Sequence, residues 1–246
     1  MPDGLLLLHA FPLDARMWEP QLSAFSTVVP VVAPHLPGFG GSEPAGSVMT
    51  MAAAADRVLG ELDGAGIDRA VVCGLSMGGY VSLELWRRAP ERFAGVVLAN
   101  TRAGADTEEG AAKRRALAER LLNEGTGFLV ECPPPLLSDG APEEIRTLVR
   151  HLIADQPAAS VAAASLGMAE RQDSTPDLAA IDVPALVITS TGDALIPPDV
   201  SSPMAEQILG ARLEIIEGPG HLSNLEAPDE FNRLLELHLE RSGIFG

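Results

Sequence analysis

One serine of this sequence stands in a setting that suits covalent chemistry, in the segment Gly74-Leu75-Ser76-Met77-Gly78-Gly79. An apolar run precedes the segment and a helical pattern follows it, so we expect a tight turn from a strand into a helix. In such a turn the glycines leave room for neighbouring backbone, and the serine hydroxyl is held clear of the sheet. We predict that Ser76 is a nucleophile, although a tightly packed structural turn would use the same small residues.

A serine hydroxyl is a weak nucleophile unless a base lies within hydrogen-bonding reach. His221 follows the last apolar run in the loop Gly218-Pro219-Gly220-His221, which suits a base that must approach the serine. The base needs a carboxylate that fixes its tautomer. Asp193 follows another apolar run and is the first candidate, because open α/β sheets bind ligands at the carboxyl ends of their strands. Asp199 is the second candidate, whereas Asp182 precedes its strand and should lie at the opposite edge.

Attack on a carbonyl group creates an oxyanion that needs N–H donors already in place. Met77, directly after the serine, is expected to supply one backbone N–H. The loop 9–12 follows the first apolar run and is expected to supply the other, from Phe11. His9 in the same loop is expected to support the loop structurally rather than to act as a second base.

Two further histidines lie in helical patterns, where no neighbouring motif indicates a catalytic role. His238 lies in the last helical pattern and is expected at the surface. His151 lies in a long interval between strands, and the sequence leaves open whether it faces solvent or a pocket.

A substrate pocket is expected where the nucleophile meets apolar side chains of the loops and of the interval 101–176. The predicted lining residues are Phe11, Phe39, Met77, Leu136, Leu137 and Met168. Each of these side chains would also fit an ordinary core. The same interval carries eight basic residues: Arg102, Lys113, Arg114, Arg115, Arg120, Arg146, Arg150 and Arg171. One of them could pair with a substrate carboxylate, but a solvated helix face explains them as well.

The elements that must position these residues alternate along the chain. Short apolar runs, typical of strands covered on both faces, occupy 5–8, 28–33, 70–73, 95–99, 184–189 and 212–216. Helical patterns occupy 51–64, 78–89, 204–210 and 229–241. This alternation predicts an α/β architecture with right-handed crossovers. About 75 residues separate the fourth run from the fifth, with helical patterns near 107–124, 142–155 and 157–170. We therefore predict a core formed by 1–100 and 177–246, and an inserted helical cap, not an independent domain, formed by 101–176.

Composition excludes several classes of protein. The net charge of −17 disfavours nucleic acid and anionic lipid as partners. No apolar run approaches the ~18 residues of a membrane span, and the N-terminus lacks the features of a signal peptide. Cys73 and Cys132 are expected to be free thiols, and no metal-ligand spacing occurs. We expect a cytoplasmic monomer or homodimer that uses neither metal nor cofactor.

The motifs taken together resemble those of the α/β-hydrolase superfamily. They are His9-Ala10-Phe11-Pro12, Leu36-Pro37-Gly38-Phe39-Gly40-Gly41-Ser42, Gly74-Leu75-Ser76-Met77-Gly78-Gly79, Asp193-Ala194-Leu195-Ile196-Pro197 and Gly220-His221-Leu222-Ser223-Asn224-Leu225-Glu226. Their order and spacing are most similar to those of small bacterial carboxylesterases and 3-oxoadipate enol-lactonase-like hydrolases. The resemblance implies a mostly parallel sheet of about six strands flanked by helices, in the order 4-3-5-6-7-8 of the family. The cap would be inserted before the penultimate strand, and the leading β-hairpin would be missing.

Two residues depart from the family's pattern within these motifs. Ala10 stands where the family usually has glycine, which restricts positive φ in the oxyanion loop. His35 stands where many relatives carry aspartate, which would bring an imidazole near the site.

The resemblance implies a serine hydrolase that cleaves a small carboxylic ester or lactone through an acyl-enzyme. The same residues would also support hydrolysis of a C–C bond or cofactor-free perhydrolase (haloperoxidase) activity. A small-molecule receptor with little turnover is the alternative from a different class, because the fold hosts many functions.

Overall fold

The computed structural model describes residues 3–244, which form one six-stranded sheet in the order β2-β1-β3-β4-β5-β6. Every neighbouring pair of strands is parallel. The strands are β1 (Gly4–Leu8), β2 (Val31–Val32), β3 (Ala70–Leu75), β4 (Phe93–Ala99), β5 (Ala185–Ser190) and β6 (Arg212–Ile216). The predicted fold class and strand order are therefore confirmed.

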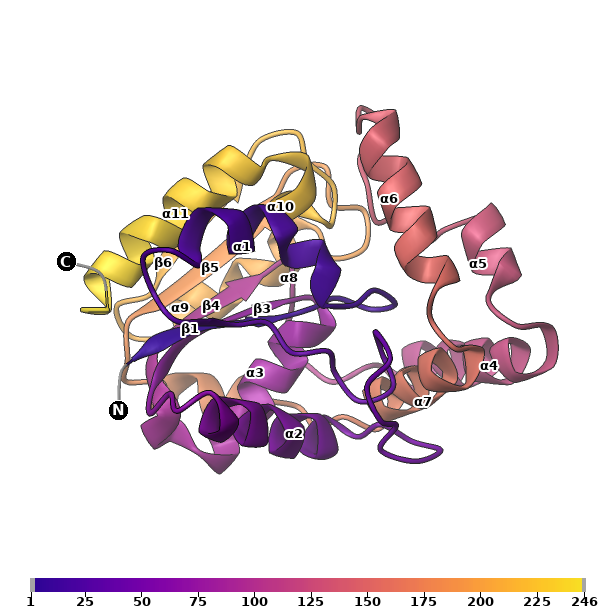
Figure 1. Ribbon diagram of the computed structural model, residues 1–246, viewed down its shortest axis with the longest axis horizontal. Coiled ribbons are helices and arrows are strands. Elements are labelled where there is room, and N and C mark those ends of the chain that lie inside the picture. Colours follow the sequence, from indigo (N-terminus) through magenta and orange to yellow (C-terminus); the bar gives the residue numbers. More distant parts are fainter. Residues whose placement is uncertain (1–2, 245–246) are drawn as a thin grey trace.

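Helices cover both faces of the sheet (Figure 1). They are α1 (Glu19–Phe25), α2 (Met51–Gly64), α3 (Met77–Arg88), α8 (Pro198–Ser201), α9 (Pro203–Gln207), α10 (Ser223–Glu226) and α11 (Pro228–Arg241). Three short 3-10 segments complete this part, at Ala15–Trp18, Pro90–Arg92 and Thr175–Ala180. Helices α1 and α11 lie on one face, whereas α2 and α3 lie on the other. No helix among residues 3–244 is long and apolar enough to cross a membrane.

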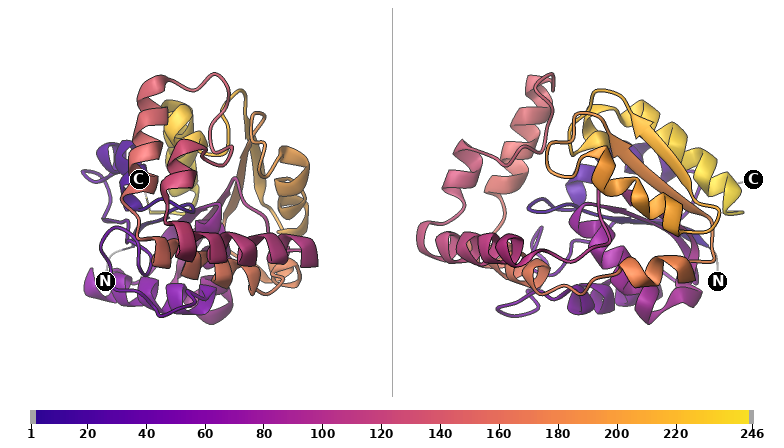
Figure 2. Two further views of the ribbon diagram at one scale, coloured as in Figure 1. Left: turned by 90° about the vertical axis from the view of Figure 1, so that its right-hand side faces the viewer. Right: turned by 180° about the vertical axis from the view of Figure 1, so that it is seen from behind.

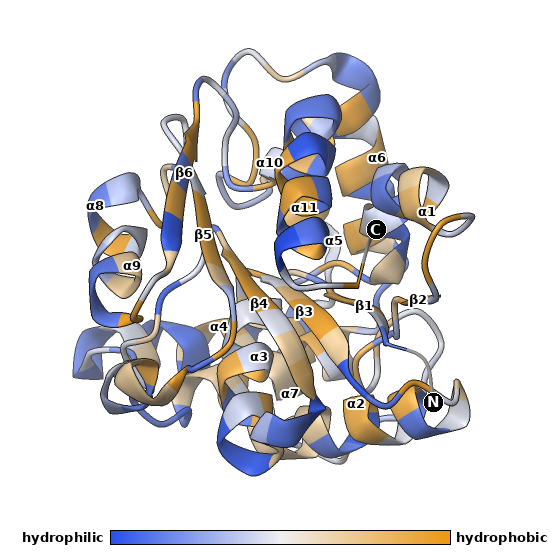
Figure 3. Cartoon of the chain, turned by 90° about the vertical axis from the view of Figure 1, so that its left-hand side faces the viewer, coloured by the Kyte–Doolittle hydropathy of each residue, from blue (hydrophilic) through white to orange (hydrophobic). Residues whose placement is uncertain are grey.

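The strands differ in how far they are covered. Every residue of β1, β3, β4 and β5 is buried, as the apolar runs predict. The prediction was wrong for β6, where Leu213 and Ile215 remain 38% and 44% exposed. This strand has a neighbour on one side only, and Figure 3 shows that it mixes hydrophilic and hydrophobic residues. β2 keeps only two residues of its predicted run, because Pro30 has no N–H to contribute to the ladder.

Four helices fill the interval between β4 and β5. They are α4 (Glu108–Glu124), α5 (Gly127–Glu131), α6 (Glu143–Ala154) and α7 (Ala158–Ala169). Three match the predicted helices within one residue at each end, and α5 was not predicted. Figure 2 shows α4 and α7 side by side, and all four lie beyond one edge of the core (Figure 1). The division of the chain into core and inserted cap stays a prediction.

One residue of the core corrects a prediction from the sequence. His238 was expected at the surface, but it is only 2% exposed on the side of α11 that packs against the sheet. Burial lowers the pKa of His238 to about 4, and the nearby Arg241 and Arg212 act in the same direction. Both cysteines are free thiols, as predicted. Cys73 is buried and Cys132 is exposed.

Candidate active site

Ser76 lies at the turn between β3 and α3, with a φ of 56° that non-glycine residues seldom adopt. Two glycines permit this turn by allowing close backbone approach. A Cβ on Gly78 would lie 2.0 Å from the carbonyl oxygen of Leu8, and a Cβ on Gly74 would lie 2.3 Å from that of Gly78. Only glycine fits either position, so the local sequence fixes where the hydroxyl of Ser76 emerges.

His221 and Asp193 form a buried pair. The Nδ1 atom of His221 lies 2.8 Å from Oδ2 of Asp193, and the two side chains are 2% and 0% exposed. The backbone N–H groups of Leu195 and Ile196 donate to Oδ1 of Asp193 at 2.9 Å. Because the carboxylate can only accept, Nδ1 carries the proton and Nε2 is left free to accept one.

The hydrogen bonds of Asp193 keep it ionised. Burial by itself would raise the pKa of this carboxyl. The bond and charge of His221 outweigh that effect, with further bonds from the Ile196 N–H and the Asn100 amide, so the pKa of Asp193 falls below its usual range. A carboxylate held in this way can stabilise an imidazolium as it forms.

Asn100 contributes to this site and was missed by the sequence reasoning. It directly follows β4 with a φ of 44° and is fully buried. Its Nδ2 donates to Oδ2 of Asp193 at 3.0 Å and to the hydroxyl of Ser190 at 2.8 Å, and its Oδ1 accepts from Ser223 at 2.6 Å. Its position at the carboxyl end of a buried strand was the signal that could have revealed it.

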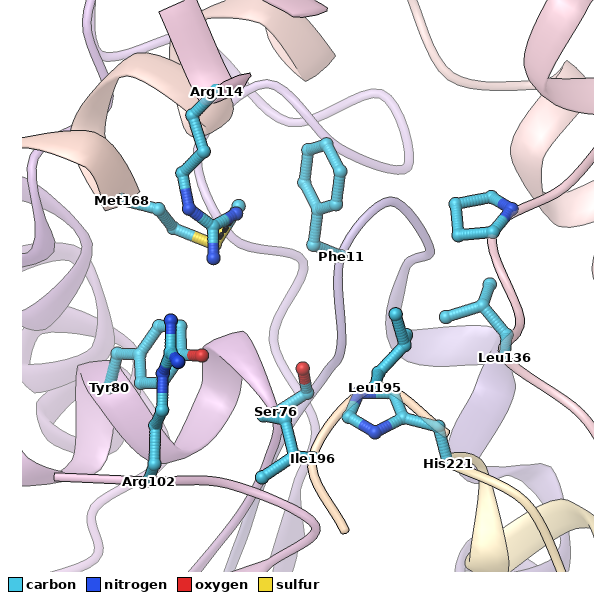
Figure 4. A pocket seen from close by; sticks show the side chains of 11 residues that line it. Phe11, Ser76, Tyr80, Arg102, Arg114, Leu136, Met168, Leu195, Ile196 and His221 are labelled. Atoms are coloured by element: carbon cyan, nitrogen blue, oxygen red, sulfur yellow. Dashed lines mark hydrogen bonds between the residues drawn. The ribbon is translucent and has the colours of Figure 1, made fainter. Parts of the chain in front are cut away.

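Ser76 and His221 line one cavity of about 240 Å³. The other lining residues are Phe11, Tyr80, Arg102, Arg114, Pro134, Leu136, Met168, Leu195 and Ile196 (Figure 4). Among the described residues, no hydrogen bond joins the Ser76 hydroxyl to the His221 ring. Catalytic hydrogen bonds are often long in structures without substrate and shorten when the substrate binds.

The predicted lining residues divide into two groups. Phe11, Leu136 and Met168 line the cavity with Ser76. Phe39 and Met77 are not among the lining residues, and both belong to the buried core. Leu137 lines a neighbouring cavity beside the proline-rich loop instead. The sequence also did not identify Tyr80, Pro134, Leu195 or Ile196 as lining residues.

The backbone N–H groups of the two predicted oxyanion donors are unpaired in the described part of the chain. Among residues 3–244, neither the N–H of Phe11 nor the N–H of Met77 has a hydrogen-bond partner in the protein. Met77 is the first residue of α3, where helix geometry leaves N–H groups unpaired and the helix dipole favours negative charge.

The remaining histidines are not part of this cavity. His9 is buried, its Nε2 accepts from the N–H of Leu36 at 3.0 Å, and its Nδ1 lies 3.1 Å from the carbonyl of Ala10. Burial lowers the pKa of His9 to about 4, so it is neutral at pH 7. His35 accepts from the N–H of Ala15 through Nδ1, and His151 is exposed on α6. Ala10 does not adopt a positive φ.

The other aspartates considered lie at the surface. Asp199 is exposed on α8, and Asp182 is exposed before β5. Within the described part of the chain, no group of three or more His, Cys, Asp or Glu side chains is arranged to hold a metal ion.

Residues 5–234 match the alpha/beta hydrolase family. The chain is 30% identical to 3-oxoadipate enol-lactonase 1 of Acinetobacter baylyi, over 93% of this chain and 85% of the relative. Among solved structures, a malate-bound thermophilic esterase from Thermogutta terrifontis superposes with a TM-score of 0.93 at 38% identity, covering 98% and 92% of the two chains. The enol-lactonase from Burkholderia xenovorans superposes with a TM-score of 0.86 at 30% identity, covering 97% and 91%. The chain therefore belongs to the alpha/beta hydrolase family.

Proposed function

We propose that this protein is a serine hydrolase that cleaves small carboxylic esters or lactones, with Ser76 as nucleophile, His221 as base and Asp193 as the orienting acid. The observation that carries the proposal is that Ser76, which has a strained backbone, and His221 line the same cavity. The Nδ1 atom of that imidazole is hydrogen-bonded to a buried carboxylate. The similarity to an esterase and to enol-lactonases agrees with this reaction class.

In the first half of the cycle, Nε2 of His221 accepts the proton of the Ser76 hydroxyl as its oxygen attacks the substrate carbonyl. The N–H groups of Phe11 and Met77 donate to the oxyanion that forms, which is supported by their lack of protein partners among residues 3–244. His221 then gives its proton to the leaving oxygen, and an acyl group remains on Ser76.

In the second half, His221 accepts a proton from water as the water attacks the acyl-enzyme. Collapse of the second tetrahedral intermediate returns that proton to Ser76 and releases the carboxylic acid. The cycle consumes only substrate and water. The cavity of about 240 Å³ suits a small substrate, since drug-sized ligands occupy pockets of roughly 300–1,000 Å³.

A fluorophosphonate probe followed by peptide mass spectrometry tests the nucleophile directly. We expect stoichiometric labelling of Ser76 and none in Ser76→Ala, because only a serine activated by a base attacks the probe. The same substitution should lower kcat by roughly 10³-fold or more on an ester substrate. Labelling of a different serine, or near-normal turnover by Ser76→Ala, would exclude the proposed mechanism.

A substrate panel then separates the rival reactions. The panel contains p-nitrophenyl esters, a lactone, a vinylogous diketone, and acetate with hydrogen peroxide. We expect turnover of the esters or the lactone to dominate. A single burst of product equal to the enzyme concentration, without further turnover, would instead indicate a receptor.

A further inference from the structure

Two arginines line the cavity that contains Ser76. Arg102 follows β4 and Arg114 lies on α4, and both belong to the lining. Figure 4 shows them on the same side of the cavity, with their guanidinium groups directed toward one another and with His221 on the other side of Ser76. Their side chains are 34% and 22% exposed, so they are partly shielded from solvent. A substrate bound at Ser76 therefore lies beside two fixed positive charges.

One buried carboxylate holds these arginines in place. Asp106 is 1% exposed and forms ion pairs with Arg102, Arg114 and Arg171. Arg171 also donates to the carbonyls of Met168 and Gly104 and lies over the ring of Tyr80, and only its buried Nε lacks a partner within residues 3–244. It does not line the cavity. Three guanidinium charges thus face one carboxylate, which leaves an excess of two positive charges in this cluster. The whole protein, in contrast, has a net charge of −17.

The donors of the two cavity arginines are only partly used. Within residues 3–244, the Nε atom of Arg102 is buried and has no hydrogen-bond partner. One amino group of Arg114 has only the weak acceptor Sδ of Met168, at 3.4 Å. Charged donors that are shielded and unpaired are costly, and a carboxylate is the group that guanidinium donors bind best.

We propose that Arg102 and Arg114 bind a carboxylate of the substrate, so that the preferred substrate is a half-ester or lactone derived from a dicarboxylic acid. This inference rests on the proposed function of Ser76 and His221. Since His221 must protonate the leaving oxygen, the leaving group lies on the side of His221. The arginines lie on the opposite side of Ser76 in Figure 4, so the carboxylate belongs to the acyl part that stays on the serine.

The test compares esters that differ only in the distal charge. Monomethyl succinate, glutarate and adipate are assayed by pH-stat beside methyl butanoate, pentanoate and hexanoate. We expect kcat/KM to be at least about 10-fold higher for the anionic member of the best pair, as charge-assisted hydrogen bonds require. Arg102→Gln and Arg114→Gln should each lower kcat/KM by roughly 10-fold or more on that anionic ester, and by less than about 3-fold on its neutral partner.

Arg115→Gln is the matched control, because Arg115 is exposed on the same helix and does not line the cavity. It makes the same change in net charge and should leave both substrates unaffected. Circular dichroism and the Tm of each variant establish whether it is folded. Equal losses on anionic and neutral esters, or a wild-type preference for the neutral series, would overturn the inference while leaving the ester hydrolase intact.

A binding measurement separates this inference from the proposed function. Calorimetric titration of glutarate into Ser76→Ala needs no turnover, so it reports on the arginines alone. We expect measurable binding that weakens about 10-fold or more when Arg102→Gln or Arg114→Gln is added, but not when Arg115→Gln is added. Binding that is indifferent to both cavity arginines would refute the carboxylate site even if all esters are cleaved. Failure of every ester with glutarate still bound would refute the proposed function alone.

Discussion

The two walls of the cavity are built differently. The sheet-edge wall contains Ser76 and His221, which follow β3 and β6. Asp193, which bonds His221, has both carboxylate oxygens hydrogen-bonded. The helical wall is formed by Arg114 of α4, Met168 of α7 and Leu136 of the loop before α6. The guanidinium donors of Arg114 are only partly paired. A chemical step needs groups held in one geometry, whereas substrate recognition tolerates side chains that adjust.

The largest expected effect concerns the orienting carboxylate of the sheet-edge wall. Asp193→Asn should lower kcat by about 10⁴-fold, because an amide stabilises the wrong tautomer of His221. Asp199→Asn is the matched control and should change kcat by less than about 2-fold, since Asp199 is exposed on α8. Steady-state kinetics on one ester measures both variants. If Asp199→Asn were the damaging change, the assignment of the acid would be reversed.

The next effect compares packing in the two regions. Gly78→Ala should destabilise the fold by about 3 kcal/mol or more, because the new Cβ would lie 2.0 Å from the Leu8 carbonyl. Gly127→Ala, at the first residue of α5, meets no atom within 4 Å and should stabilise by about 0.5 kcal/mol. Urea unfolding gives both free energies of unfolding. Similar losses in the two variants would show that the start of α5 is packed as tightly as the turn at Ser76.

A smaller effect is expected for substrate selection by the helical wall. Leu136→Ala enlarges the cavity and should shift the ratio of kcat/KM toward longer acyl chains by roughly 10-fold, as expected for a change of a few methylenes. Leu137→Ala serves as control, because Leu137 faces the neighbouring cavity and should leave the ratio unchanged. A series of p-nitrophenyl esters from acetate to octanoate measures the ratio. Equal shifts in the two variants would remove Leu136 from the wall of the acyl pocket.

The smallest effect concerns how the free energy of unfolding depends on pH. It compares His238 of α11, which packs on the sheet, with His151 of α6. The folded pKa of His238 is about 4, below its ordinary value of 6.5, so between these values only the unfolded chain takes up the proton. The contribution of neutral His238 to the free energy of unfolding is therefore fully present above pH 6.5. It falls by about 1.4 kcal/mol per pH unit as the pH decreases from 6.5 toward 4. His238→Gln should reduce the slope of the free energy of unfolding against pH by that amount. His151→Gln, on exposed α6, should leave the slope unchanged.

These pH measurements are made by urea unfolding between pH 4.5 and 6.5. Buried His9 contributes a slope of the same sign in the wild type and in both variants, because its folded pKa is also about 4. It therefore cancels in the comparison. An unchanged slope in His238→Gln would mean that this imidazole takes up a proton in the folded state.

Several features of the site could be predicted from the sequence because local chain geometry decides them. The glycines at 74 and 78 define the turn at Ser76 through backbone contacts within a few residues of it and with the adjacent strand. Asp193 and His221 follow apolar runs that become β5 and β6, and parallel strands bring their carboxyl ends to one edge. The roles assigned to these side chains stay predictions until the kinetics described above are measured.

The errors concern contacts between distant parts of the chain. The position of Asn100 after a buried strand indicated the sheet edge, but the sequence could not show that its amide bonds Asp193, since 93 positions separate the two residues. His238 was placed at the surface although it lies seven residues after Phe231 and three after Leu235, which is the spacing of the apolar face of α11 that packs on the sheet. Phe39 and Met77 were assigned to the pocket from their positions beside site motifs, but they belong to the buried core and do not line the cavity.

The amino-acid sequence by itself determined the alternation of strands and helices, the turn at the nucleophile and the order of the motifs, because periodicity and backbone sterics act over short stretches of chain. Only the tertiary structure decided that Asp106 gathers three arginines and that two of them face the cavity. The sequence alone left those arginines indistinguishable from a solvated helix face. Which charges meet, and how far water is excluded from them, depends on elements brought together by the packing of the whole chain.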